Sequence, residues 1–196
     1  RPFAPGGEIA AQVEAGGEGA ERWKDGDRVI AVTGFGGLAE KVVIPAKSAF
    51  RLPEERSFEE GAALLLTYAT SIHALLDRGR LQAEQTLLVL GAAGGVGLAA
   101  VELGKANEAR VIAAVSSEEK ARAARDAGAD EAIVYPSGPF DRLGQKALAK
   151  QFKDADGPAG ADVIFDPAGG DYTEAALRSI AWEGRFLVVG FPAGIA

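Results

Sequence analysis

The 196-residue chain contains no cysteine and no methionine, and His73 is its single histidine. Without cysteine, neither a disulfide nor a thiolate metal site can form within this stretch. No apolar run approaches the roughly eighteen residues of a membrane-spanning helix, and no signal peptide is visible, so we expect no membrane partner. The missing cysteines are compatible with a reducing compartment, and we expect a cytoplasmic protein.

Positive charge is also scarce, with 21 Lys and Arg against 28 Asp and Glu and a net charge of −7. A surface that binds nucleic acid relies on clustered Lys and Arg, and no basic stripe is present, so we expect no nucleic-acid partner. The hydrophobic fraction of 47% is typical of a soluble globular protein with a substantial core. Because the sequence begins at Arg1 and stops just after a strand-like run, we expect an internal portion of a longer polypeptide.

From about Gly79 onward, short apolar runs alternate with helical patterns. Such alternation predicts βαβ crossovers and a parallel sheet, whose ligands lie at the carboxyl edge. We therefore predict an α/β fold with a doubly wound, Rossmann-type parallel sheet over residues 79–196. Ser116 or Ser117 is the expected N-cap of the second helix, and Gly128 its end. The expected strands are 87–90, 110–115, 131–135, 161–166 and 185–189, and the expected helices are 96–107, 118–127, 140–153 and 171–182.

The first part of the chain has a different pattern. Residues 8–14, 28–33 and 39–44 are β-rich, and glycine or proline separates them without intervening helices. This arrangement favours a small antiparallel barrel or sheet. Residues 58–76 then predict a helical stretch, broken near Thr67, that bridges to the second part. We place the first domain at residues 1–78.

A glycine cluster follows the first strand of the second part, where Leu87–Gly97 reads LLVLGAAGGVG. A buried strand that turns sharply into a helix points free N–H groups outward, which suits the pyrophosphate of a dinucleotide. Gly94 leaves room for phosphate, and Gly97 lets the helix pack close to the strand. The match is to a variant, A-x-G-x-x-G, of the usual fingerprint. The predicted cradle comprises Ala92, Ala93, Gly94, Gly95, Val96 and Gly97.

The end of the second strand bears on the choice of cofactor. NAD-selective sheets place an acidic residue there, whereas this strand ends in Val115 followed by Ser116 and Ser117. Two hydroxyls can donate to a 2′-phosphate, and Lys120 adds positive charge one turn later. Lys120 is equally compatible with a plain surface role. We predict NADPH as the preferred cofactor.

Four motifs in order resemble the medium-chain dehydrogenase/reductase superfamily, and most closely its zinc-free branch, the NADPH-dependent quinone oxidoreductases of the zeta-crystallin type. They are Pro5-Gly6-Gly7-Glu8, Asp25-Gly26-Asp27-Arg28-Val29, Gly36-Gly37-Leu38-Ala39-Glu40 and Ala92-Ala93-Gly94-Gly95-Val96-Gly97. The resemblance covers essentially the whole chain. It implies that residues 1–78 are part of a GroES-like β-barrel domain with a bridging helix. It also implies a homodimer.

The resemblance implies further cofactor contacts. In the family, the lysine matched by Lys120 and a tyrosine matched by Tyr135 line the adenosine phosphate. Thr70 matches the threonine of a T-A-x-x-A-L helix near the nicotinamide, although a helical threonine also bonds to its own backbone. Asp166 begins a D-x-x-G turn whose backbone, at Ala168, flanks the ribose, but it could instead cap the following helix. Gly190 and Phe191, after the fifth strand, are expected near the nicotinamide.

The sequence argues against a catalytic zinc. Zinc-dependent members of the superfamily take a ligand from a G-H-E motif, whose histidine is Gly7 here. A structural zinc lobe of four cysteines is also absent. A single histidine cannot make a metal site, and we expect His73 to be a half-buried helix residue. We predict no metal site in this chain.

No nucleophile–base pair or carboxylate dyad is evident, and we assign no catalytic residue; Tyr68 is more typical of packing. Hydride transfer to an electrophilic substrate needs mainly orientation and a dry site. The resemblance implies an NADPH-dependent oxidoreductase that acts on quinones or related activated alkenes. One alternative is a 2-enoyl thioester or enone reductase of the same superfamily. Another is a catalytically silent NADPH-binding protein with a structural or redox-sensing role.

Overall fold

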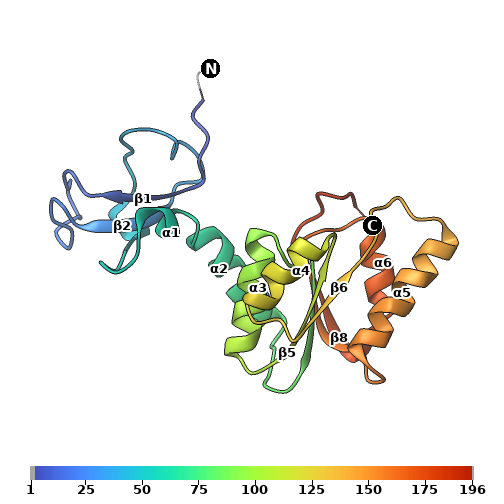
Figure 1. The fold of residues 1–196 in the computed structure, drawn as a ribbon. Coiled ribbons are helices and arrows are strands. Elements are labelled where there is room, and N and C mark those ends of the chain that lie inside the picture. Colours follow the sequence, from blue (N-terminus) through green and yellow to red (C-terminus); the bar gives the residue numbers. More distant parts are fainter. Residues whose placement is uncertain (1–2, 196) are drawn as a thin grey trace. The chain divides into compact units, whose positions relative to one another are not determined.

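The computed structural model describes residues 3–195, and the chain divides between residues 69 and 70 into two compact units (Figure 1). Each unit has its own sheet, and each is described by itself below. The domain boundary that we expect after residue 78 lies in the first helical segment of the second unit, and it stays a prediction.

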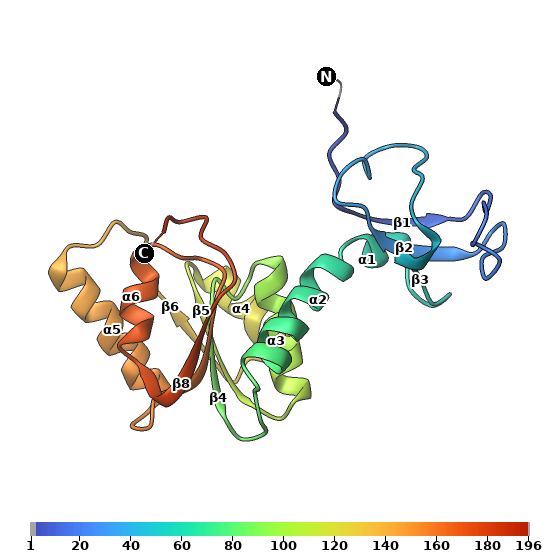
Figure 2. The same cartoon turned by 180° about the vertical axis from the view of Figure 1, so that it is seen from behind.

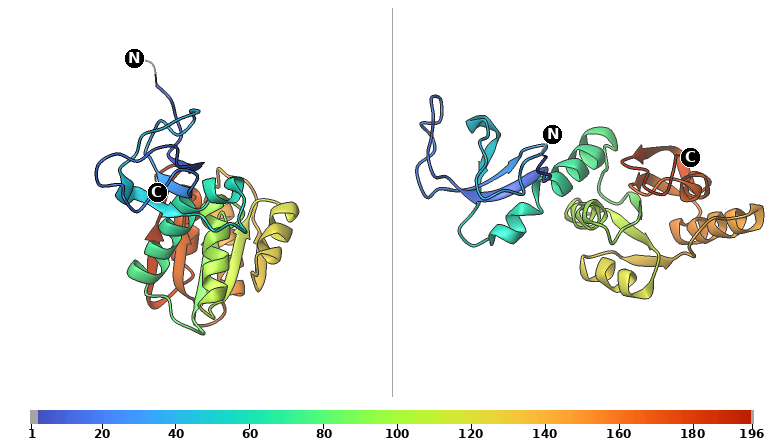
Figure 3. Two further views of the ribbon diagram at one scale, coloured as in Figure 1. Left: turned by 90° about the vertical axis from the view of Figure 1, so that its left-hand side faces the viewer. Right: turned by 90° about the horizontal axis from the view of Figure 1, so that it is seen from above.

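The second unit is built on a five-stranded parallel sheet in the order β6-β5-β4-β7-β8. Figures 1 and 2 show α3 and α4 on one face of this sheet and α5 and α6 on the other, and the view from above in Figure 3 shows the same layers. This is the doubly wound α/β architecture that the sequence predicts. The strands are β4 (Thr86–Leu90), β5 (Arg110–Val115), β6 (Glu131–Val134), β7 (Ala161–Asp166) and β8 (Ile180–Val188), and the helices are α3 (Gly95–Ala106), α4 (Glu118–Asp126), α5 (Arg142–Asp156) and α6 (Asp171–Leu177).

Successive residues of the central strands alternate between two cores, one on each face of the sheet. Leu87 and Val89 of β4 join the core with the helices α3 and α4, whereas Leu88 and Leu90 join the core with α5 and α6. All four side chains are fully buried. A strand that is buried on both faces must be apolar throughout, which explains why these strands read as continuous hydrophobic runs.

The first unit contains a three-stranded antiparallel sheet in the order β1-β2-β3, formed by β1 (Glu8–Gln12), β2 (Arg28–Val32) and β3 (Ala49–Arg51). The predicted strand over residues 39–44 is wrong. Within the described residues this segment forms no ladder, and the Val43 side chain is 99% exposed. β-branched residues favour a strand only where a neighbouring strand pairs with them.

The predicted helical stretch over residues 58–76 consists of α1 (Phe58–Ala62), α2 (Leu65–Ile72) and a π-helical turn, His73–Arg78. A capping box between Ser57 and Glu60 begins α1. The break lies between α1 and α2 and not near Thr67, which stays helical and donates its hydroxyl to the carbonyl of Ala63 at 2.7 Å.

The last predicted helix is too long. It ends at Leu177, and β8 already begins at Ile180, so Trp182 and Gly184 belong to the strand. Ser179 donates its hydroxyl to the carbonyl of Ala176 at 2.9 Å and so satisfies the end of the helix. A positive φ of 62° at Glu183 and an irregular register opposite β7 interrupt the alternation by which a strand is recognised.

The last residue of α5, Asp156, is a buried carboxylate at the amino edge of the sheet. Only 4% of its surface is exposed, and neither carboxylate oxygen has a hydrogen-bond partner among the described residues. Burial, with a smaller contribution from the nearby carboxylate of Glu131, raises the pKa of Asp156 to about 6, although the neighbouring Ser179 hydroxyl and Arg110 guanidinium act to lower it. The nearby hydroxyl of Ser179 donates its hydrogen bond to the carbonyl of Ala176 and not to the Asp156 carboxylate.

This carboxyl predicts a pH-dependent stability. An unfolded aspartate titrates near 3.8, so between about pH 4 and 6 the folded state binds more protons than the unfolded state. Stability therefore falls as the pH rises through this window and stays reduced above it. We expect D156N to raise the free energy of unfolding by about 2 kcal/mol at pH 8 and to change it little at pH 4.

Urea denaturation at both pH values measures this effect. The matched control is D154N, because Asp154 lies on the same helix but is exposed and paired with Lys150. An equal pH dependence for the wild type and D156N would contradict the role of Asp156.

Candidate functional site

The residues that we predict to bind a cofactor converge on one edge of the second unit. Because all five strands are parallel, their carboxyl ends share that edge. Every candidate except Thr70, which lies on α2, is in the turns after β4, β5, β6, β7 and β8 or in the first turn of α3 or α4. Thr70 is nevertheless near the turn after β4, because the adjacent Ser71 donates its hydroxyl to the carbonyl of Val96 at 2.9 Å.

The turn after β4 is held by a very close approach of helix to strand. A Cβ atom on Gly97 would lie 2.5 Å from the carbonyl oxygen of Gly91 and 2.8 Å from the Cα of Ala92, so only glycine fits there. Gly91 has a φ of +56°. Ala92 is fully buried, and its N–H donates to the carbonyl of Ala114 in β5 at 3.2 Å. The turn is thereby held to α3 by the close packing at Gly97 and to β5 by the hydrogen bond of Ala92.

In contrast, the start of α3 is open. Gly94 is the N-cap, and no side chain bonds to the first turn of the helix. A Cβ atom on Gly94 would meet only the carbonyl oxygen of Gly91, at 3.4 Å, and both Gly94 and Gly95 are exposed. The first N–H groups of a helix lack intrahelical partners, and the helix dipole makes this end positive. The N–H of Gly94 itself donates to the carbonyl of Gly91 at 3.0 Å, so the turn offers an anion the N–H donors of Gly95 and Val96 and the space in front of Gly94.

At the end of β5, Ser116 and Lys120 come together. The ammonium group of Lys120 donates to the hydroxyl of Ser116 at 2.8 Å, and both residues are exposed. Ser117 caps α4 by accepting a bond from the N–H of Lys120 at 3.3 Å, so it is the N-cap of the two expected serines. Glu118 and Glu119 are exposed, as expected of acidic residues in a first helical turn.

Tyr135 follows β6 and is 6% exposed. Its ring packs on Tyr172, with 4.8 Å between the ring centroids. Burial, together with the proximity of Tyr172, raises the pKa of Tyr135 to about 12, although a hydrogen bond with the backbone of Gly91 acts to lower it. The phenol therefore stays protonated at neutral pH and lies beside the glycine turn. It supports the site from within the core.

The turn after β7 is organised by Asp166, whose side chain is fully buried. Its carboxylate accepts bonds from the N–H groups of Ala168 and Gly169, both at 2.8 Å, and from the hydroxyl of Thr173 at 2.6 Å. Gly170, and not Asp166, is the N-cap of α6. The alternative in which Asp166 caps this helix is therefore wrong, because its carboxylate accepts bonds from two N–H groups of the turn and from the Thr173 hydroxyl, and from no N–H among the described residues of α6.

The turn after β8 packs against this Asp166 turn. The N–H of Gly190 donates to the carbonyl of Asp166 at 3.2 Å, and a Cβ atom on Gly169 would lie 2.7 Å from the Cα of Phe191. The structure thus brings Ala168, Gly190 and Phe191 together, and the ring of Phe191 is 58% exposed.

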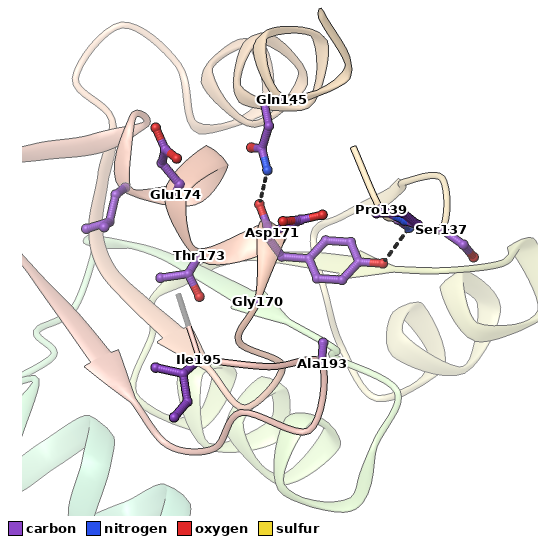
Figure 4. Close-up of a pocket in the computed structure, with 12 residues that line it drawn as sticks. Ser137, Pro139, Gln145, Gly170, Asp171, Thr173, Glu174, Ala193 and Ile195 are labelled. Carbon is purple, nitrogen blue, oxygen red and sulfur yellow. Dashed lines mark hydrogen bonds between the residues drawn. The ribbon is translucent and has the colours of Figure 1, made fainter. Parts of the chain in front are cut away.

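A pocket of about 880 Å³ lies next to this edge, between the loop after β6 and the helices α5 and α6 (Figure 4). Gln145 donates to the carbonyl of Asp171 at 2.8 Å, and the hydroxyl of Tyr172 accepts a bond from the N–H of Gly138 at 3.3 Å. None of the predicted residues lines this pocket. Its acidic side chains, Asp171 and Glu174, make it a poor site for phosphate.

A zinc site does not fit the described residues. Between residues 3 and 195, no three His, Cys, Asp or Glu side chains are placed to hold a metal ion. The imidazole Nδ1 of His73 lies 2.8 Å from Asp77 Oδ2, and its side chain is 60% exposed, more than the half-buried position that we expect.

Two family models match the chain. Residues 95–195 match the family described as zinc-binding dehydrogenase, and residues 1–54 match the alcohol dehydrogenase GroES-like domain. Quinone oxidoreductase-like protein 2 from Bos taurus is 40% identical over 194 residues, which cover 98% of this chain and 53% of the relative. The chain therefore spans about half the length of the curated relatives that it matches.

Solved structures are also similar. Escherichia coli quinone oxidoreductase complexed with NADPH is 31% identical, with a TM-score of 0.88 over 100% of this chain and 58% of that protein. CurK enoyl reductase is 27% identical, with a TM-score of 0.83 over 94% and 53% of the two chains. No helix within the described range is both long and apolar enough to cross a bilayer.

The two glycines of the turn predict opposite responses to substitution. We expect G97A to lower the free energy of unfolding by about 3 kcal/mol, because backbone atoms of Gly91 and Ala92 would have to move. G94A, at an open N-cap, should cost less than about 1 kcal/mol. Denaturant unfolding of the two variants measures the difference. Equal losses would contradict the close approach at Gly97.

Proposed function

Because the chain belongs to the zinc-binding dehydrogenase family, in the quinone oxidoreductase branch of the medium-chain dehydrogenases/reductases, we propose that it binds NADPH and serves hydride transfer to a quinone or related activated alkene. The observation that carries the proposal is the uncapped start of α3, with open space in front of Gly94. An NADPH complex of a similar protein, the E. coli quinone oxidoreductase, supports the same cofactor.

In the proposed complex, the N–H groups of Gly95 and Val96 bind the pyrophosphate, and Gly94, whose N–H donates to the carbonyl of Gly91 at 3.0 Å, leaves the space for it. The pair of Ser116 and Lys120 binds the 2′-phosphate, because a hydroxyl and an ammonium group donate to it and no acidic side chain ends β5. Ser117 contributes less, since its hydroxyl oxygen already caps α4.

At the other end of the cofactor, Ala168, Gly190 and Phe191 lie close together and can contact the ribose and nicotinamide. The exposed ring of Phe191 is suited to excluding water from that end. Thr70 contributes from α2. When bound, the nicotinamide supplies the hydride. The role of the chain is then to orient the nicotinamide ring. This role requires neither a nucleophile nor an acid–base pair.

This chain spans about half the length of its relatives. The identity of the substrate is therefore part of the proposal. We propose a quinone first, and a 2-enoyl thioester or enone second, since the enoyl reductase CurK is structurally similar. The third candidate is a protein that binds NADPH without turnover. We further propose a homodimer, as the family resemblance implies, and a cytoplasmic location, with which the missing cysteines are compatible.

NADPH oxidation by the full-length protein tests these candidates, followed at 340 nm with 1,4-naphthoquinone or with crotonyl-CoA. Turnover of the quinone alone supports the proposal, and turnover of crotonyl-CoA favours the enoyl reductase. Tight NADPH binding with neither activity favours the silent protein. Failure to bind NADPH would overturn all three.

Lys120 predicts a selective effect on the two cofactors. We expect K120A to raise KM for NADPH about tenfold and to leave KM for NADH within twofold, because only the phosphorylated cofactor gains the charged contact. R122A is the matched control, since Arg122 is exposed on the same helix. Initial rates with both cofactors measure the effect. Equal changes for NADPH and NADH would remove Lys120 from the phosphate site.

A further inference from the structure

We infer that Ser71 is a positioning residue that fixes the dinucleotide turn against the helical segment carrying Thr70. This inference rests on the proposed NADPH binding. Ser71 is fully buried and is among the few buried polar side chains of the described residues. Its hydroxyl donates to the carbonyl oxygen of Val96 at 2.9 Å, which joins two segments that lie 25 residues apart in the sequence.

The acceptor of this bond, the carbonyl oxygen of Val96, lies in the first turn of α3. Val96 is the second residue of α3 and directly follows Gly94 and Gly95, the open N-terminal residues of the helix. A carbonyl at this position already accepts the N–H four residues later within the helix, and its second lone pair is available to Ser71. The hydroxyl therefore adds a lateral contact at the turn without replacing a bond of the helix.

An apolar contact holds the same segment a few residues further on. Leu75, in the π-helical turn, is fully buried in the core that includes Ala92, Ala100 and Val101. Ala92 belongs to the glycine turn and Ala100 to α3. The segment is thus held at two points, by packing of Leu75 in the core on this face of the sheet and by a directional bond from Ser71 to α3. Packing alone tolerates sliding, whereas a hydrogen bond fixes one alignment.

This geometry gives Ser71 a role distinct from stability alone. Loss of the hydroxyl leaves the Val96 carbonyl bonded within α3, so no buried group becomes unpaired. What changes is the alignment of the first turn of α3 with the segment that carries Thr70. Because these two parts contact neighbouring regions of the proposed cofactor, their misalignment weakens cofactor binding.

The test is NADPH binding to the full-length S71A variant, measured by fluorescence titration well below its melting temperature. We expect the Kd for NADPH to rise about fivefold, the value of one neutral hydrogen bond. KM for NADPH should rise by the same factor while kcat stays within about twofold. S71T, which keeps the hydroxyl, should recover most of the affinity.

S179A is the matched control. Ser179 is also buried, at 2% exposure, and its hydroxyl also donates to a backbone carbonyl at 2.9 Å, but it lies at the amino edge of the sheet before β8. It should lose a similar amount of stability and keep the wild-type Kd. Wild-type affinity in S71A, or equal losses of affinity in S71A and S179A, would overturn the inference alone. A wild-type protein that binds no NADPH would overturn the proposed function and this inference with it.

Discussion

The contact on which the second unit depends is the approach of α3 to the end of β4. At Gly97 the helix lies so close to the backbone of Gly91 and Ala92 that there is no room for a side chain. This contact makes the helix begin immediately after the strand, at the carboxyl edge of the sheet. The same turn leaves the helix without a side-chain cap at Gly94, so the N–H groups of the first helical turn, from Gly95 onward, face open space. The close approach at Gly97 thus produces both the dense packing of the turn against the sheet and the open N–H donors at the start of α3.

Parallel strands then gather the other candidate residues at that edge. The turn after β7 is formed before any ligand binds, because the carboxylate of Asp166 accepts two bonds from N–H groups of its own turn and one from the hydroxyl of Thr173 in α6. Tyr135 acts in the same way by packing on Tyr172 beside Gly91. Among the predicted site residues, only Ser116 and Lys120 have charged or hydroxyl side chains that are exposed. A hydrogen bond joins these two side chains. The edge is therefore a rigid frame with a few available donors, as expected of a preorganised binding site.

The sequence predicted the parallel sheet well because burial on both faces makes each central strand a continuous apolar run bounded by turn residues. It failed where structure depends on distant partners. Residues 39–44 have strand propensity but no pairing strand among the described residues, and Trp182 follows a helix that ends early. The exposure of His73, which we expected to be half-buried, likewise depends on the tertiary structure. Ser71 gave no signal, since a helical serine reveals its acceptor only in the folded chain.

The most direct test of the central claim is a crystal structure of the full-length protein with NADPH. The pyrophosphate should lie on the N–H groups of Gly95 and Val96, in the space in front of Gly94, with the 2′-phosphate beside Lys120. A cofactor bound at any other edge of the sheet, or a pyrophosphate without contact to the start of α3, would contradict the account.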